Sequence, residues 1–321
     1  MTGKAEAAPF MEVLDTAIAS SGPCGLCGAA AAELVFSKSV GNLTTPSTFS
    51  ILRCRSCGLV RTEPRLTNAA FELCYRHDYW GRTNAESLDW VRRDQRHRTG
   101  FLSRFRAGGS VLDVGCGLGL FLRALDPAHW NRYGVEPMSM PYQEALRWLG
   151  PDRISRSELT VAGLPAGQFD VVTFWDSLEH LSDPRPALHE AFRLLRPQGL
   201  VLVSLPNFES YQARHFREDW FELSVPYHLY HYTPASVTRL LETCGFRVLL
   251  LENGESLVNY HSLKHSLLNR LTRIHGRNAG RLRYYLSKPF LRPWEWISTR
   301  LGGGSSMRLC AEVVKPSRTT P

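Results

Sequence analysis

The chain has 321 residues, of which 43% are hydrophobic, and carries a formal net charge of +8. No stretch approaches the roughly 20 apolar residues of a membrane span. The first twenty residues lack a basic start followed by an apolar core, which argues against a secretory signal, so we expect a cytoplasmic protein. The charge suits nucleic acid, anionic lipid or phosphorylated substrates without selecting among them.

The N-terminal region carries two C-x-x-C-G pairs. We expect residues 1–21 to form a mobile tail and residues 22–62 a small zinc ribbon with strands at 49–53 and 59–61. In a cytosolic chain, paired knuckles favour a structural Zn²⁺ bound by four thiolates over redox pairs. The glycine after each second cysteine permits the tight turn. The predicted zinc ligands are Cys24, Cys27, Cys54 and Cys57.

Residues 63–105 are predicted to be a helical linker, with a basic amphipathic helix from Ser87 to Phe105. From residue 106 to 315, strands and helices alternate, which predicts an α/β domain with a mostly parallel sheet and helices on both faces. The predicted strands lie near 110–114, 132–136, 152–156, 169–175, 200–205, 246–252 and 307–314. The predicted helices lie near 118–125, 138–149, 184–196 and 234–244.

The first strand of this domain ends in Asp113 and then breaks into glycines at every second position, Gly115, Gly117 and Gly119. Glycines let the backbone approach a ligand closely. A dinucleotide fingerprint would place its third glycine one residue later, at Leu120. A carboxylate beside the turn would also repel a phosphate held at a helix N-terminus. The turn therefore favours a cationic ligand.

A second acid, Glu136, ends the next strand. A carboxylate at this point can accept hydrogen bonds from two ribose hydroxyls. Two carboxylates around a glycine turn suit a nucleoside that carries positive charge. S-adenosylmethionine, with its sulfonium and ammonium groups, meets that description.

Residues 100–255 resemble the class I S-adenosylmethionine-dependent methyltransferases. The segment Phe169–His180 resembles that family's fourth strand and the following loop, and Leu194–Leu200 resembles its turn into the fifth strand, which Ser204–Asn207 ends. Pro226–Pro234 is similar to a segment of small-molecule methylases related to quinone-biosynthesis enzymes. The resemblance implies a Rossmann-like, seven-stranded sheet and S-adenosylmethionine as cofactor.

The same resemblance implies roles for individual residues at the cofactor. It assigns Asp113, Gly115, Gly117 and Gly119 to the amino-acid and ribose side, Glu136 to the ribose hydroxyls, Met138 to the adenine, and Trp175 with Asp176 to the methionine end. In some quinone O-methylases an acid–Glu–His cluster holds a divalent ion. Asp176, Glu179 and His180 keep that arrangement loosely, which leaves a second metal site open.

The acceptor side is expected in the loop after the fifth strand. Methyl transfer requires the protein to hold the acceptor close and, where needed, to remove its proton. His228 and His231 are candidate general bases, and Asp176 is a third candidate catalytic residue. The alternative is that both histidines only brace the loop through hydrogen bonds.

Residues 258–305 interrupt the alternation of strands and helices as a basic helical insertion. Leu263 to Cys310 holds ten Lys or Arg and one acid, Glu295. The segment is either a helical cap or a lid that recognises an anionic or membrane-associated substrate.

These features favour an S-adenosylmethionine-dependent methyltransferase acting on an oxygen or carbon of a small-molecule, sugar-linked or lipid-linked biosynthetic intermediate. The alternative is an rRNA methyltransferase, because some rRNA guanine methylases also carry a four-ligand zinc module before this fold. The fourth strand, which ends in Phe174-Trp175-Asp176-Ser177, lacks the Asn-Pro-Pro-Tyr signature common among base-nitrogen methylases. A third hypothesis is a non-catalytic partner-binding module, against which the intact glycine turn argues. The sequence leaves the oligomeric state open.

Overall fold

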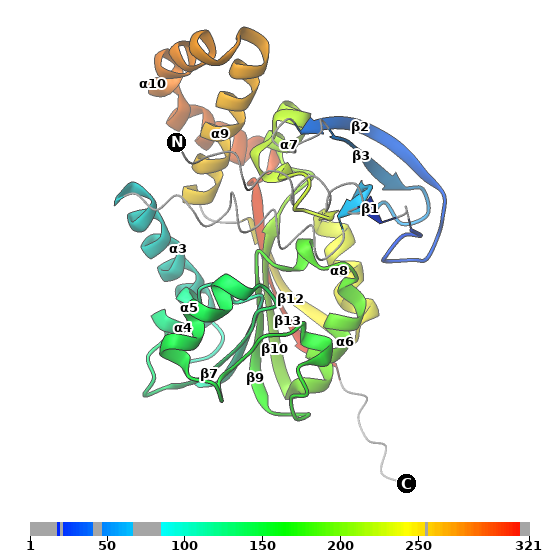
Figure 1. Cartoon of the computed structure of the whole chain (residues 1–321), viewed down its shortest axis with the longest axis vertical. Helices are drawn as coiled ribbons and strands as arrows, with labels where there is room; N and C mark the ends of the chain where they lie inside the picture. The colour runs from blue at the N-terminus through cyan, green and yellow to red at the C-terminus, as the bar shows by residue number, and fades with distance from the viewer. Residues whose placement is uncertain (1–17, 20–21, 41–46, 67–84, 254–255, 315–321) are drawn as a thin grey trace, which may run out of the picture. The chain divides into compact units, whose positions relative to one another are not determined.

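The computed structural model describes residues 18–19, 22–40, 47–66, 85–253 and 256–314 (Figure 1). The chain divides into two compact units. The first holds Met1–Asn84, Asn207–Thr233 and Ser256–Ser305, and the second holds Ala85–Pro206, Pro234–Glu255 and Ser306–Pro321. The predicted tail lies outside the described residues except for Ile18–Ala19 (β1), which pairs with Arg65–Leu66 (β5).

The second unit is built on the predicted seven-stranded sheet, whose order is β12-β13-β10-β9-β6-β7-β8. All neighbouring pairs are parallel except those of β13, which runs antiparallel to both β10 and β12. The sheet confirms the Rossmann-like fold class. Its strands are β6 (Gly109–Val114), β7 (Trp130–Val135), β8 (Ile154–Ser155), β9 (Phe169–Trp175), β10 (Leu195–Pro206), β12 (Phe246–Asn253) and β13 (Ser306–Val313).

Helices cover both faces of this sheet. In chain order, the connections β6→β7→β8 move toward one edge of the sheet, and the connections β9→β10→β12 move toward the other edge. Because crossovers between parallel strands are right-handed, the helices of these two halves lie on opposite faces. In Figure 1, α4 and α5 lie on one side and α6 and α8 on the other. The helical elements of the unit are α3 (Ala85–Ser103), α4 (Leu120–Ala124), α5 (Ser139–Leu149), η1 (Leu159–Val161), η2 (Leu178–His180), α6 (Pro184–Leu194) and α8 (Pro234–Thr243).

The first unit contains an antiparallel sheet of four strands in the order β11-β4-β3-β2. Its strands are β2 (Ala32–Val40), β3 (Ser47–Cys54), β4 (Val60–Glu63) and β11 (Tyr230–His231). The sequence predicts β3 and β4 but not β2 or β11. Strand β11 comes from far along the chain. The N-terminal segment with the two C-x-x-C-G pairs (residues 22–63, called the cysteine module below) therefore shares one sheet with the loop after β10.

The remaining helical elements of the first unit pack on that sheet. A shared core contains Ile51 and Val60 from the strands, Phe216 and Trp220, and Leu263. The helices are α7 (Tyr211–Phe216), η3 (Arg217–Asp219), η4 (Phe221–Leu223), α9 (Ser256–His275) and α10 (Arg277–Gly302). Within the described part of the chain, no helix combines the length and apolar character needed to cross a bilayer.

Candidate active site

The glycine turn after β6 adopts backbone conformations that favour glycine. Gly115, Gly117 and Gly119 have φ angles of +70°, +56° and +70°. A Cβ on Gly115 would lie 2.9 Å from Cβ of Ser177, and one on Gly119 would lie 2.4 Å from Cζ2 of Trp148. Side chains at these points would be both strained and crowded, so the alternating glycines are a steric requirement of the turn.

Asp113 lies buried at the end of β6, directly before the turn. Its Oδ1 accepts a 2.7 Å hydrogen bond from the Thr173 hydroxyl on the neighbouring strand β9. Burial raises the pKa of Asp113 to about 7, although the Thr173 hydroxyl and the Arg98 guanidinium act to lower it. The carboxyl group is therefore held in the protein interior without a full counter-charge.

Glu136 follows β7 and is also buried. Its Oε2 accepts from the backbone N–H of Gly117 at 2.9 Å, and its Oε1 accepts from that of Met138 at 2.8 Å. Burial raises the pKa of Glu136 to about 7 against the lowering effect of these two amides. Glu136 thus ties the glycine turn to the start of α5, of which Met138 is the N-cap residue.

These two acids fit S-adenosylmethionine. A sulfonium, an ammonium and ribose hydroxyls would supply the positive charge and the hydrogen-bond donors that buried carboxylates lack. The positive-φ glycines expose backbone at the same strand end, where open parallel sheets bind their ligands. A phosphate would instead add negative charge beside two carboxylates.

The end of β9 carries Trp175 and Asp176. The Trp175 ring is buried and packs edge-on against Phe121 at a centroid distance of 5.3 Å, and its Nε1 has no hydrogen-bond partner among the described residues. Asp176 has a φ of +52°. Its carboxylate accepts from the Ser204 hydroxyl at 3.0 Å and from Arg98 Nη2 at 2.8 Å.

Arg98 of α3 is a site residue that sequence reasoning did not identify. Its guanidinium bridges Asp94 at 2.9 Å and Asp176 at 2.8 Å, and lies 5.8 Å from the centre of the Trp175 ring. It also acts on the pKa of Asp113, which places it within electrostatic reach of the acid at the first strand end. No motif surrounds it in the sequence, so only the packing of α3 reveals it.

The second metal site left open by the sequence does not form around Asp176. Glu179 is buried and His180 is half-buried in η2. The Asp176 carboxylate is engaged with Ser204 and Arg98. Among the described residues it does not join Glu179 and His180 in a group with metal-binding spacing.

The two candidate histidines of the first unit differ in their hydrogen bonds. The Thr62 hydroxyl donates to the backbone oxygen of His228 at 2.8 Å and also lies 2.9 Å from Nε2 of His231. A hydroxyl has one proton, so Nε2–H of His231 donates to Thr62. Burial lowers the pKa of His231 to about 3, which makes it a weak base. These contacts favour a bracing role for His231.

His228 is held differently. Its Nδ1 lies 2.8 Å from the backbone oxygen of Glu222, which can only accept, so Nδ1–H is the donor. In the neutral ring the lone pair is then on Nε2. A backbone carbonyl that fixes the tautomer in this way is a common arrangement for a histidine that acts as base.

The four predicted zinc ligands converge. Their sulfur atoms all lie within 4.8 Å of one another, with Cys24 and Cys57 3.4 Å apart and Cys27 and Cys54 3.6 Å apart. Sulfurs bound tetrahedrally to zinc at about 2.3 Å are separated by about 3.8 Å, whereas a disulfide requires about 2.05 Å. The cluster therefore fits a structural zinc ion and excludes disulfides.

The local turns of this cluster match the motif. In each knuckle the glycine has a positive φ, +73° at Gly28 and +76° at Gly58, and its N–H donates to the carbonyl of the first cysteine. Burial would raise the pKa of the Cys54 thiol, but the amides of Cys57 and Ser56 outweigh it and lower that pKa to about 7. Amides directed at the sulfur stabilise the thiolate that a metal requires.

A mostly parallel seven-stranded sheet with one antiparallel strand, and two buried acids at adjacent strand ends around a glycine turn, define the S-adenosylmethionine-dependent methyltransferase class. A family described as "Methyltransferase domain" matches residues 87–251, slightly more than half of the chain, and the chain belongs to this family. The chain therefore contains a methyltransferase domain, and its buried acids and glycine turn are the residues that would hold S-adenosylmethionine.

Curated relatives align with part of the chain. A "Ubiquinone biosynthesis O-methyltransferase" of Erwinia tasmaniensis is 34% identical over 134 residues, 40% of this chain and 52% of the relative. A "Probable S-adenosylmethionine-dependent methyltransferase" of Mycolicibacterium smegmatis is 33% identical over 172 residues, 51% of this chain and 62% of the relative. The chain thus spans between about half and two thirds of the length of these two relatives.

Among solved structures, an S-adenosylmethionine-dependent methyltransferase of Thermotoga maritima, described as a possible histamine N-methyltransferase, has a TM-score of 0.49. It is 18% identical, and the alignment covers 76% of this chain and 98% of that protein.

Proposed function

We propose that this enzyme transfers the methyl group of S-adenosylmethionine to an oxygen or carbon of a small-molecule, sugar-linked or lipid-linked intermediate. The observation that carries the proposal is the pair of buried carboxylates, Asp113 and Glu136, beside the positive-φ glycine turn. The cofactor, when bound, supplies an activated methyl group. The acceptor class rests on the relatives named ubiquinone biosynthesis O-methyltransferase.

The residues of the second unit divide the work of cofactor recognition. Glu136 would accept the ribose hydroxyls, and Met138 beside it would lie against the adenine. Arg98 and the Nε1–H of Trp175, which has no partner among the described residues, are donors that suit the carboxylate of the methionine end. Asp176 would fix Arg98 in place through the 2.8 Å ion pair.

We infer that His228 is the residue that removes the proton of an oxygen acceptor. The hydrogen bond from Nδ1–H to Glu222 fixes the tautomer of the ring, so that Nε2 is the basic nitrogen. His231 would brace the same segment through Thr62. The cysteine module would then serve the acceptor side, because Thr62 belongs to its strand β4.

The experiment follows the labelled methyl group of S-adenosylmethionine into two sets of acceptors, a panel of phenols and lipid-linked phenols, and total RNA. We expect label in the panel. His228→Gln should lower kcat by about 10²–10⁴-fold, while His189→Gln, at an exposed histidine of α6, should not change it.

Label that enters RNA alone, with RNA binding that weakens steeply as salt rises, would select the rRNA alternative. An unchanged kcat in His228→Gln would remove this residue from the mechanism while leaving the acceptor class in place.

A further inference from the structure

Helix α10 exposes a continuous apolar stripe. Six large apolar side chains between positions 282 and 297 are 46–71% exposed, and two prolines inside the helix, Pro289 and Pro293, are exposed with them. The six are Leu282, Tyr285, Leu286, Phe290, Trp296 and Ile297. At 3.6 residues per turn, the eight side chains occupy an arc of about 140°.

The stripe lies opposite the face of α10 that is already buried. Tyr284, Leu291, Glu295 and Ser298 are buried and fall on the other side of the helix wheel. The stripe is therefore not the core-facing side of the helix. Large exposed apolar surfaces of this kind mark an interaction site.

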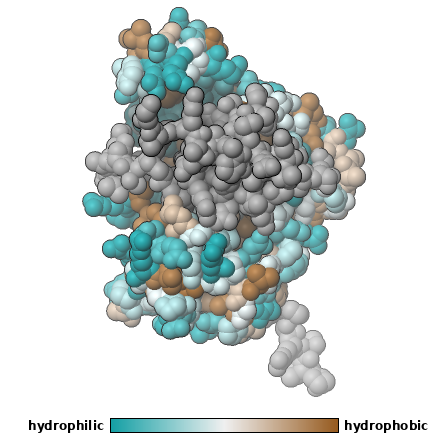
Figure 2. Space-filling view, in the orientation of Figure 1, coloured by the Kyte–Doolittle hydropathy of each residue, from teal (hydrophilic) through white to brown (hydrophobic). Residues whose placement is uncertain are grey.

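Cationic side chains of α10 accompany the stripe. They are exposed, and none has an acidic partner among the residues that the structure describes: Arg277, Arg281, Arg283, Lys288, Arg292 and Arg300. On the same helix wheel, Arg283 and Arg292 lie at the edges of the stripe, Arg300 lies within it, and the others lie toward the buried face. Several lie on aromatic rings, with Arg292 3.7 Å from the centre of the Tyr260 ring and Arg300 4.0 Å from that of Trp296. The single acid of α10, Glu295, is buried. Over α9 and α10, Figure 2 shows brown and teal side chains side by side.

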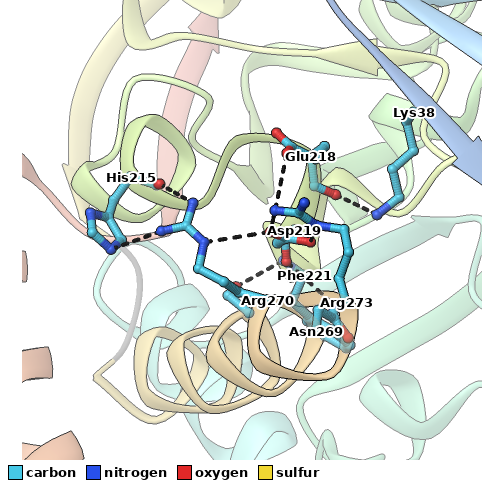
Figure 3. Close-up of polar contacts among 9 residues, drawn as sticks. Lys38, His215, Glu218, Asp219, Phe221, Asn269, Arg270 and Arg273 are labelled. Carbon is cyan, nitrogen blue, oxygen red and sulfur yellow. Dashed lines mark hydrogen bonds and ion pairs between the residues drawn. The ribbon is translucent and has the colours of Figure 1, made fainter. Parts of the chain in front are cut away.

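The cations of the neighbouring helix α9 are used differently. Arg273 binds the buried Asp219 through Nε at 2.8 Å and Nη2 at 2.6 Å, and Arg270 lies 3.5 Å from the same carboxylate (Figure 3). Lys38 of β2 donates to the backbone oxygen of the adjacent Glu218. This network ties α9 to η3 and to the cysteine-module sheet. The arginines that contact Asp219 thus serve the fold, while the cations of α10 are exposed and have no acidic partner among the described residues.

We propose that the α10 stripe docks the enzyme on an anionic lipid surface, with α10 lying in the headgroup region. Aromatic and aliphatic side chains on one face, flanked by arginine and lysine, are the pattern of an interfacial helix. The positive flank complements anionic lipid headgroups. Pro289 and Pro293 lack backbone N–H groups, so the carbonyls one turn earlier lose their helical hydrogen bonds. Water and lipid headgroups can donate to these carbonyls and hydrocarbon cannot, which favours the headgroup region.

A second copy of this chain is a poorer occupant of the stripe. Two copies packed through it would bring their rows of arginines together without an exposed acid on α10 to pair with them. Like charges placed opposite each other in an interface oppose association.

The test measures binding of the full chain to phosphatidylcholine vesicles with and without phosphatidylglycerol. We expect binding only to the anionic vesicles, with affinity that falls as salt rises. Phe290→Ser should weaken that binding by about tenfold, and Lys288→Glu by at least about fivefold. Val161→Ser, at a 73% exposed valine of η1, is the matched control and should bind as the unaltered chain does.

Circular dichroism and S-adenosylmethionine affinity should be the same for every variant, so that misfolding is distinguished from lost docking. Three outcomes would overturn the proposal. They are no vesicle binding at low salt, unchanged binding in both α10 variants, and a dimer by light scattering that Phe290→Ser converts to monomer. The last would assign the stripe to a second copy.

Discussion

At the scale of single residues, Glu136 is the side chain after β7 on which we expect the cofactor site to depend most directly. Its two carboxylate oxygens accept hydrogen bonds from the backbone amides of Gly117 and Met138, so it shapes the turn at which we propose that the cofactor binds. We predict that Glu136→Ala weakens S-adenosylmethionine binding by about 1–3 kcal/mol, because buried donors lose their acceptor. Isothermal titration calorimetry measures this as a Kd that is about 5-fold to 150-fold higher.

Two variants sharpen that measurement. Glu136→Gln keeps the shape and one acceptor oxygen and should fall between the unaltered chain and Glu136→Ala. Asp152→Asn, at an exposed acid just before β8, removes one negative charge without touching the turn and should leave Kd unchanged. If Glu136→Ala binds as tightly as the unaltered chain, the assignment of Glu136 to the ribose is wrong.

The sequence predicts those site residues whose position follows from the local pattern of strand and turn. Asp113, the glycines and Glu136 stand at strand ends, and a strand end is visible from a run of apolar residues followed by a turn. Arg98 is not visible in this way, because it meets Asp176 78 positions later in the chain. His231 was visible as a residue type, but the burial that lowers its pKa was not.

At the scale of elements, the cysteine module and β11 form one sheet. Because β11 closely follows the proposed base His228, we expect the metal that holds the module together to be needed for methyl transfer. Thr62 N–H and Oγ1 bind the backbone of Leu229 and His228. We predict that chelating the metal unfolds this small sheet, since structural zinc supplies about 10–16 kcal/mol to comparable modules, and that methyl transfer is lost. Elemental analysis should find one zinc per chain before chelation.

Cofactor affinity separates this effect from general unfolding. The predicted cofactor residues belong to the second unit and the cysteines to the first. The Kd for S-adenosylmethionine should therefore stay within about twofold after chelation or in Cys54→Ser. Cys244→Ala, at a buried cysteine outside the cluster, should keep both zinc and activity. Full methyl transfer by a zinc-free chain would contradict the proposed role of the module.

Elements were predictable to different degrees for a physical reason. In the second unit, the strands alternate with helices and carry continuous apolar runs, so their order follows from the sequence. Strand β11 has only two residues, and its existence depends on pairing with β4 nearly 170 positions earlier. Strand β2 is mostly half-buried or exposed along its length, which gives it a weak apolar pattern.

At the scale of the whole molecule, a chain with a net charge of +8 buries two acids, Asp113 and Glu136, at adjacent strand ends. Burial raises the pKa of Asp113 and of Glu136 from their ordinary values to about 7. The ligand-free folded state therefore binds more protons than the unfolded state between about pH 4 and 7. The stability that these two groups contribute is complete below about pH 4 and is lost as pH rises through 7.

Cofactor binding should favour the ionised forms of Asp113 and Glu136, which the ligand-free protein disfavours. A cationic ligand favours the ionised carboxylates and lowers their pKa values, so we predict that S-adenosylmethionine binding releases protons and that its affinity falls as pH drops below 7. The fall should approach about tenfold per pH unit for each carboxylate that must ionise. Calorimetry in buffers of different ionisation enthalpy counts the protons. The thermal stabilisation given by the cofactor should be larger at about pH 7.5 than at about pH 6.

Glu136→Gln isolates the contribution of Asp113, because a glutamine side chain does not titrate. In this variant, cofactor binding should release fewer protons, and the affinity should depend less steeply on pH, by the amount that one carboxylate contributes. A binding curve with the same slope in this variant would mean that Glu136 is already ionised before the cofactor arrives. Proton uptake on binding would mean that the site receives an anion. That result would contradict the proposal that two buried carboxylates bind a cationic cofactor.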